Sequence, residues 1–121
     1  MTTLKVGIAT YDDMKARTMA IARGERHVAA DEPKVWFTST ESFAQILSAG
    51  NRELLRVIAE QAPGSLDELA RITGKAKSNL SRTLRSMEGY GLVRLERKER
   101  GRIAPTVMHD RVELDLPLTR L

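Results

Sequence analysis

The sequence has no cysteine, two histidines and only 4% aromatic residues among its 121. The lack of cysteine excludes disulfide bonds, iron–sulfur clusters, thiolate metal ligands and cysteine nucleophiles. The longest stretch without a charged residue, 42–51, is far shorter than the ~20 residues that a bilayer crossing needs. The first residues lack the apolar core of a secretory signal. We therefore expect a cytoplasmic protein with no membrane contact, no metal site and no cofactor.

Residues suited to catalysis are also scarce. His27 and His109 lie in segments with the composition of loops, and neither belongs to an H-x-x-x-H pair. Residues 73–75 read TGK, as at the end of a phosphate-binding loop, but Leu69 stands where that loop requires its first glycine. The sequence therefore predicts that the protein is not an enzyme.

Positive charge is concentrated in one quarter of the chain. Residues 71–102 carry ten lysines and arginines against three glutamates, a net charge of +7, whereas the whole chain has +4. The segments on either side, 1–70 and 103–121, are both net acidic. A partner with a phosphate backbone requires such a segment, but a basic face that only contacts solvent has the same composition. Charge alone leaves both interpretations open.

Hydrophobic periodicity divides the chain into three parts. Residues 1–49 predict a β-α-β arm, with strands at 4–8 and 35–37 and a helix at 12–23 between them. After a short helix that a capping box at 38–41 would start, residues 50–107 predict three helices and a hairpin. These elements are expected at 52–61, 66–73, 77–88, 92–97 and 102–107.

The predicted helix at 77–88 has two faces of different chemistry. Leu80, Leu84 and Met87 recur at the spacing of one helical face, which predicts that they are buried. The opposite face carries hydroxyl and guanidinium groups without a carboxylate: Ser78, Ser81, Arg82 and Arg85. Short side chains allow a helix to approach the base edges of a DNA major groove, where arginine can donate two hydrogen bonds to guanine. This face therefore favours DNA binding over a merely solvated surface.

The sequence from Gly74 to Val93 resembles the recognition segment of MarR/ArsR-like winged helix-turn-helix regulators, and the resemblance covers about residues 50–107. It implies a winged helix-turn-helix over residues 50–107. Together with the β-α-β arm (1–49) and a C-terminal strand (108–121), this predicts an α+β, mostly helical fold. The resemblance also implies a sequence-specific DNA-binding transcriptional regulator, a repressor that acts as a homodimer on palindromic double-stranded DNA.

The whole chain is also similar to a smaller group of bacterial and archaeal winged-helix proteins, some of which accompany toxin genes. That similarity implies an alternative function, the antitoxin of a toxin–antitoxin pair that binds its toxin protein and autoregulates the operon. The two functions are compatible, and the sequence does not separate them.

The resemblance and the charge pattern together predict the residues that contact DNA. Base-edge contacts are expected from the helix and phosphate contacts from the helix start and the hairpin: Lys75, Lys77, Ser78, Asn79, Ser81, Arg82, Arg85, Arg97, Lys98, Arg100 and Arg102. One position departs from the family, because Ala76 stands where a serine or threonine usually caps the helix. Either Ser78 caps a helix that starts later, or a DNA phosphate accepts the hydrogen bonds of the uncapped start.

The segment 112–118 alternates apolar and polar residues, which predicts a strand with one buried face. An exposed strand of this composition is prone to aggregate, so we expect it to pair with the N-terminal strand. The paired strands, with the first helix packed on them, are predicted to form the dimer or partner surface. Trp36 either anchors this arm or contributes to that interface.

Overall fold

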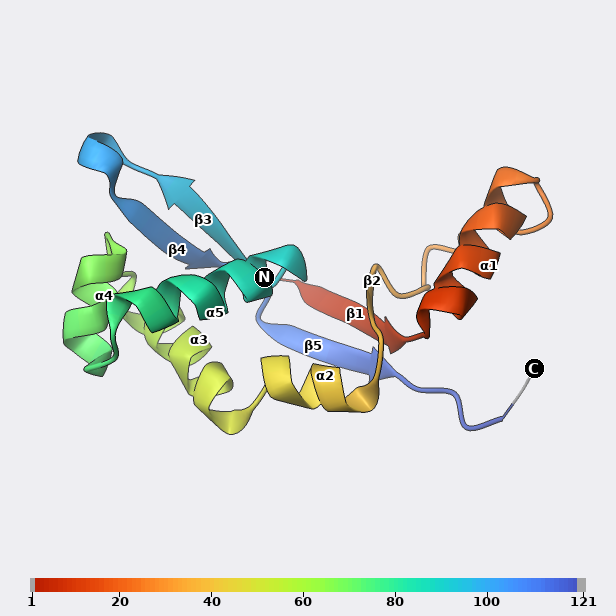
Figure 1. The fold of residues 1–121 in the computed structure, drawn as a ribbon, viewed down its shortest axis with the longest axis horizontal. Coiled ribbons are helices and arrows are strands. Elements are labelled where there is room, and N and C mark those ends of the chain that lie inside the picture. The colour runs from red at the N-terminus through yellow and green to blue at the C-terminus, as the bar shows by residue number, and fades with distance from the viewer. Residues whose placement is uncertain (1, 120–121) are drawn as a thin grey trace. The chain divides into compact units, whose positions relative to one another are not determined.

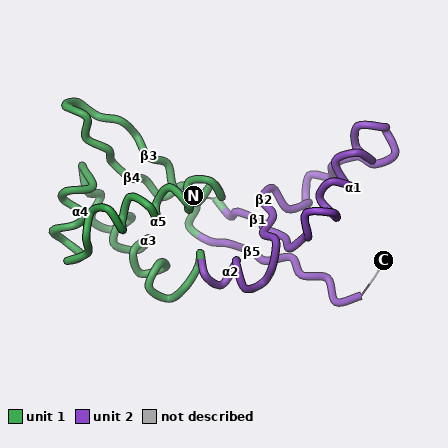
Figure 2. Tube along the Cα trace, in the orientation of Figure 1, with its two compact units in different colours: residues 1–2, 46–110 green, residues 3–45, 111–121 purple. Residues whose placement is uncertain are grey.

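The structure, a computed structural model that describes residues 2–119, has an α+β fold. These residues form five α-helices and five β-strands in two compact units, which Figure 2 distinguishes by colour. The helical unit comprises Thr2 and residues 46–110, and the sheet unit comprises residues 3–45 with the chain from 111 onward. None of the helices in the described residues is long and apolar enough to cross a membrane.

The sheet unit contains three parallel strands in the order β2-β1-β5 (Figure 1). The strands are β1 (Thr3–Ile8), β2 (Val35–Phe37) and β5 (Arg111–Asp115). Helix α1 (Tyr11–Ala22) connects β1 to its parallel neighbour β2, which confirms the predicted β-α-β arm. Strand β1 also pairs with all five residues of β5, so the predicted pairing of the N-terminal and C-terminal strands is confirmed.

One side of this sheet is apolar and buried. Leu4 and Val6 of β1 and Phe37 of β2 are at most 6% exposed. Phe43, from helix α2 (Thr40–Ile46), packs edge-to-face on Phe37 with 5.3 Å between the ring centroids. Neither α1 nor α2 has a fully buried residue, but the half-buried Phe43 brings an aromatic ring of α2 against this core.

Trp36 is held within the sheet unit by close packing. It pairs with Gly7, where an added Cβ atom would lie 2.5 Å from the indole ring. The guanidinium carbon of Arg17 lies 5.3 Å from the ring centroid, and the same side chain forms an ion pair with Glu32. The hydrogen bond from Arg17 holds the pKa of Glu32 below its usual value. These contacts favour Trp36 as an anchor of the arm.

Strand β5 differs from its prediction. The strand ends at Asp115, and none of its residues is buried. Val112 is half-buried, whereas Leu114, Leu116 and Leu118 are 37%, 44% and 91% exposed. The prediction of a buried face was wrong because β5 lies at the edge of the sheet, with a strand on one side only.

The helical unit contains three helices followed by an antiparallel hairpin (Figure 1). These are α3 (Ala49–Gln61), α4 (Leu66–Thr73), α5 (Lys77–Gly89), β3 (Val93–Arg97) and β4 (Ile103–Val107). Helix α5 packs against α4 and β3, and α3 packs against β4. Leu69 and Leu84 are fully buried, and burial of such a side chain contributes about 1.5–3 kcal/mol. This core fixes the orientation of α5.

Helices α2 and α3 do not start where the sequence predicts. Helix α3 begins at residue 49 instead of 52, because the Ser48 hydroxyl accepts a hydrogen bond from the Asn51 amide at 3.2 Å. Helix α2 begins after Ser39, whose hydroxyl accepts a hydrogen bond from the Ser42 amide at 3.0 Å, so the capping box expected at 38–41 was wrong. In both cases a serine hydroxyl satisfies an amide at the helix start.

Candidate nucleic-acid interface

Helix α5 has the two faces that its sequence predicts. Leu80, Leu84 and Met87 are at most 2% exposed and pack into the core of the helical unit. On the other face the side chains are accessible: Ser78, Asn79, Arg82 and Arg85 are exposed, and Ser81 is half-buried. The buried leucines therefore hold a polar, cationic surface toward solvent.

The arginines on this surface of α5 have no carboxylate partner among the described residues. Within residues 2–119, neither Arg82 nor Arg85 forms an ion pair. The one acidic residue of the helix, Glu88, accepts a hydrogen bond from the Leu95 amide of β3 at 2.9 Å. Its carboxylate is thus engaged with the hairpin, and the two guanidinium groups are available for an anionic partner.

The start of α5 has no side-chain cap. Ala76 occupies the cap position, and the helix begins at Lys77, so the possibility that Ser78 caps a later start is wrong. The first amides of a helix have no partner within the helix and carry the positive end of its dipole. A missing cap costs about 1 kcal/mol, which an anion at this position would offset.

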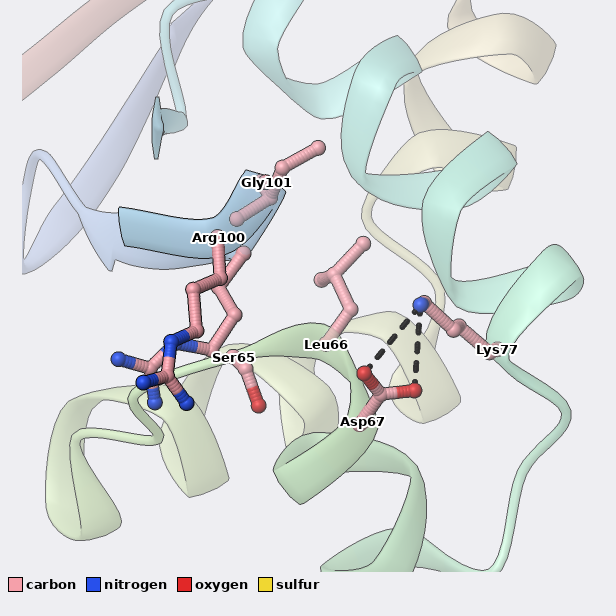
Figure 3. A pocket seen from close by; sticks show the side chains of 8 residues that line it. Ser65, Leu66, Asp67, Lys77, Arg100 and Gly101 are labelled. Atoms are coloured by element: carbon pink, nitrogen blue, oxygen red, sulfur yellow. Dashed lines mark hydrogen bonds and ion pairs between the residues drawn. The ribbon is translucent and has the colours of Figure 1, made fainter. Parts of the chain in front are cut away.

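A hollow of about 130 Å³ lies between the first turn of α4 and the tip of the hairpin (Figure 3). Three of the side chains that line it are cationic and one is anionic: Lys77, Arg100 and Arg102, with Asp67. Ser65, Leu66, Gly101 and Ile103 complete the lining. The excess of positive charge makes the hollow suitable for an oxyanion such as a phosphate group.

Asp67 forms an ion pair with one of these cations, Lys77. Its carboxylate lies 3.1 Å from the Lys77 ammonium, and Figure 3 shows the two side chains pointing toward each other. Both side chains are more than half exposed, so the pair contributes at most about 1 kcal/mol to stability. A phosphate could therefore replace the carboxylate at Lys77 at little cost.

The hairpin carries four of the predicted cations, at positions 97, 98, 100 and 102. Glu96 accepts a hydrogen bond from Lys98 at 3.0 Å and pairs with Arg94, and these contacts lower the pKa of the Glu96 carboxyl group. Arg100 has a left-handed backbone with φ of 60° and precedes Gly101, which has φ of 71°. A non-glycine residue in this region costs about 1–2 kcal/mol, so the tip holds Arg100 in a strained conformation.

The predicted site residues fall into three groups. Lys77, Arg100 and Arg102 line the hollow, although they are far apart in sequence. Ser78, Asn79, Ser81, Arg82 and Arg85 lie on α5 outside this lining. Three more predicted residues are exposed and also lie outside this lining: Lys75 in the loop before α5, Arg97 at the end of β3, and Lys98 directly after it.

Sequence reasoning missed the contribution of α4. Asp67 and Ser65 line the hollow, but the sequence predicts for this segment only a helix at 66–73. The Ser65 hydroxyl does cap α4, accepting a hydrogen bond from the Glu68 amide at 3.1 Å. The available signal was the position of Asp67 in the first turn of the helix immediately before the basic one.

The geometry defines a small α+β protein whose three helices and hairpin present a basic helix face beside a cationic hollow. Residues 46–114 match the HVO_A0114 family, which is more than half of the chain. The chain therefore belongs to the HVO_A0114 family. The matched region contains α3, α4, α5, the hairpin and most of β5. No curated protein matches the chain.

Proposed function

We propose that this protein is a winged helix-turn-helix transcriptional regulator, a repressor that binds palindromic double-stranded DNA as a homodimer. In this proposal α4 and α5 form the helix-turn-helix, α5 enters the major groove, and the β3–β4 hairpin is the wing. The order of three helices followed by an antiparallel hairpin supports this assignment.

One observation carries the proposal. The exposed face of α5 bears Arg82 and Arg85 without a carboxylate partner within the described residues, next to short polar side chains that allow close approach to bases. A solvated helix face of this protein looks different, since α3 pairs Arg56 with Glu53 at 3.0 Å on its surface. Unpaired arginines on a helix suit the guanine edges of a major groove.

The cationic hollow supports a second role within the same complex. Lys77, Arg100 and Arg102 line it and would contact a backbone phosphate, while the α5 face contacts base edges. Phosphate contacts position a protein on DNA, and base contacts specify the sequence. If a dimer neutralises about 8 phosphates, the logarithm of the binding constant should fall with a slope of about −7 per decade of salt.

Selection of binding sites from random duplex DNA by the purified full chain tests the proposal directly. Fluorescence anisotropy then compares the selected duplex with an unrelated one. Arg82→Ala should lose about 1–3 kcal/mol on the selected duplex and much less on the unrelated one, because it removes a base contact. Lys98→Ala should weaken binding to both duplexes alike, because it removes a phosphate contact.

Arg56→Ala is the matched control, since it removes the same charge from the surface of α3, where the arginine is paired. It should leave the preference for the selected duplex unchanged. Equal losses for Arg82→Ala and Arg56→Ala would contradict a recognition role for α5. The absence of any enriched sequence, together with a salt slope near zero, would reject DNA binding itself.

A further inference from the structure

The outer edge of β5 has no neighbouring strand within the described residues. In the order β2-β1-β5, β5 pairs with β1 on one side only. Val112 and Leu114 are in register with Leu4 and Val6, so they continue the apolar side of the sheet toward this edge. Leu114 and Leu116 are nevertheless 37% and 44% exposed. An edge strand of this kind presents unpaired backbone groups and an apolar surface to another strand.

The opposite edge of the sheet is less suited to pairing with a further strand. Strand β2 has only three residues, and Pro33 and Lys34 precede it directly. A short strand beside proline and lysine is a typical protected edge. The sheet therefore has one edge suited to strand addition, and a two-fold arrangement through that edge closes without forming fibres.

We propose that β5 pairs antiparallel with β5 of a second copy, which joins two three-stranded sheets into one. This inference rests on the proposed function and deepens its dimeric part by naming the interface. With Glu113 on the two-fold axis, all five residues of β5 pair with the same strand of the partner. Arg111 then lies opposite Asp115 of the second copy, and Val112 lies opposite its Leu114.

Charge complementarity favours a second copy of β5 as the pairing strand, and it favours this register. Both Arg111–Asp115 pairs join opposite charges, and both apolar pairs continue the buried side of the sheet. A register shifted by two residues, with Leu114 on the axis, would set Glu113 against Asp115 of the second copy. The Glu113 pair on the axis costs stability, and Arg111 of the same strand, 3.9 Å from Glu113, reduces that repulsion.

Sedimentation of the full chain without DNA tests the interface independently of DNA binding. The wild type should dimerise at micromolar concentration. Arg111→Asp and Asp115→Arg should each weaken homodimerisation at least tenfold, because each sets like charges opposite each other. Both positions are exposed, so circular dichroism should show an unchanged fold.

The decisive sample is an equimolar mixture of the two variants. In this register their heterodimer sets the introduced aspartate of one chain opposite the introduced arginine of the other, and the native Asp115 opposite the native Arg111. The mixture should therefore dimerise nearly as tightly as the wild type. A monomeric wild type, a monomeric mixture of folded variants, or single variants that dimerise normally would each overturn the proposal. A monomer that still binds DNA would reject this interface and leave DNA binding standing.

Discussion

Neutralising Asp67 tests the proposed role of the cationic hollow most directly, because this residue is the only anion among the side chains that line the hollow. Asp67→Asn keeps the size of the side chain and removes its charge. Lys77 then loses its intramolecular partner at 3.1 Å and becomes available to a phosphate. The variant also removes repulsion between the carboxylate and that phosphate.

The magnitude follows from Coulomb's law. Two unit charges about 6 Å apart at the dielectric constant of water interact with roughly 0.7 kcal/mol, and a partly desolvated interface raises this value. We therefore expect Asp67→Asn to strengthen DNA binding by about 1 kcal/mol per protomer, or roughly fivefold. The salt slope should become steeper by about one phosphate contact per protomer.

The same variant should cost little folding stability. The ion pair is more than half exposed and contributes at most about 1 kcal/mol, and an acidic side chain in the first turn of α4 adds a similar amount or less. Affinity should therefore rise while the melting temperature falls slightly. A change in the opposite direction for both quantities would contradict the geometry of the hollow.

Anisotropy titrations at several salt concentrations, with thermal melts of the free protein, provide the measurement. Glu60→Gln is the matched control, because it removes one negative charge from an exposed position of α3. It should change affinity much less than Asp67→Asn. If the two variants strengthen binding equally, net charge alone explains the effect, and the hollow holds no phosphate.

Three further variants test the strained tip, the tryptophan contact and the hairpin ion pairs. Arg100→Gly should raise the free energy of unfolding by about 0.5 kcal/mol through relief of the left-handed strain, yet weaken DNA binding several-fold; lower stability in denaturant titration would contradict the strain. Gly7→Ala should destabilise the sheet unit by about 1–3 kcal/mol, since the new Cβ atom would overlap the Trp36 ring, and near-UV circular dichroism should report the displaced indole. Glu96 has a lowered pKa, so its contribution to stability is complete at neutral pH and is lost as the pH falls through its folded value. Glu96→Gln should reduce stability at pH 7 and make the melting temperature depend less on pH in the acid range. Thermal melts of the wild type and the variant over a pH series measure this, and an equal difference at every pH would refute it.

The sequence predicts the helical unit better than the sheet edge, for a physical reason. Leu80, Leu84 and Met87 repeat at the period of one helix face, and such a pattern directly reports burial. The alternation at 112–118 reports only that a strand can form. Whether its apolar side is covered depends on which strands are its neighbours, and that depends on contacts far away in the sequence.

The candidate site also has one part that the local sequence predicts and one part that it does not. The character of α5 follows from its own residues, whereas the hollow depends on Arg100 and Asp67, which are 33 positions apart in the chain. Local composition marks residues 98–101 as a turn, but it does not show that the tip lies beside the start of α4. Contacts between α4 and the hairpin determine this part of the candidate site.

The placement of acidic residues in the helical unit separates two kinds of cation. Lys77 and Lys98 have carboxylate partners, Asp67 and Glu96, and solvent weakens both of these ion pairs. A phosphate can therefore replace either carboxylate at little cost, and such a contact is the same for every DNA sequence. Arg82 and Arg85 have no such competitor within the described residues, so their full hydrogen-bonding capacity is available to bases. In the proposed complex the hairpin cations contact phosphates, which every sequence carries, whereas the arginines of α5 contact bases. Discrimination between DNA sequences should therefore depend on α5 far more than on the hairpin.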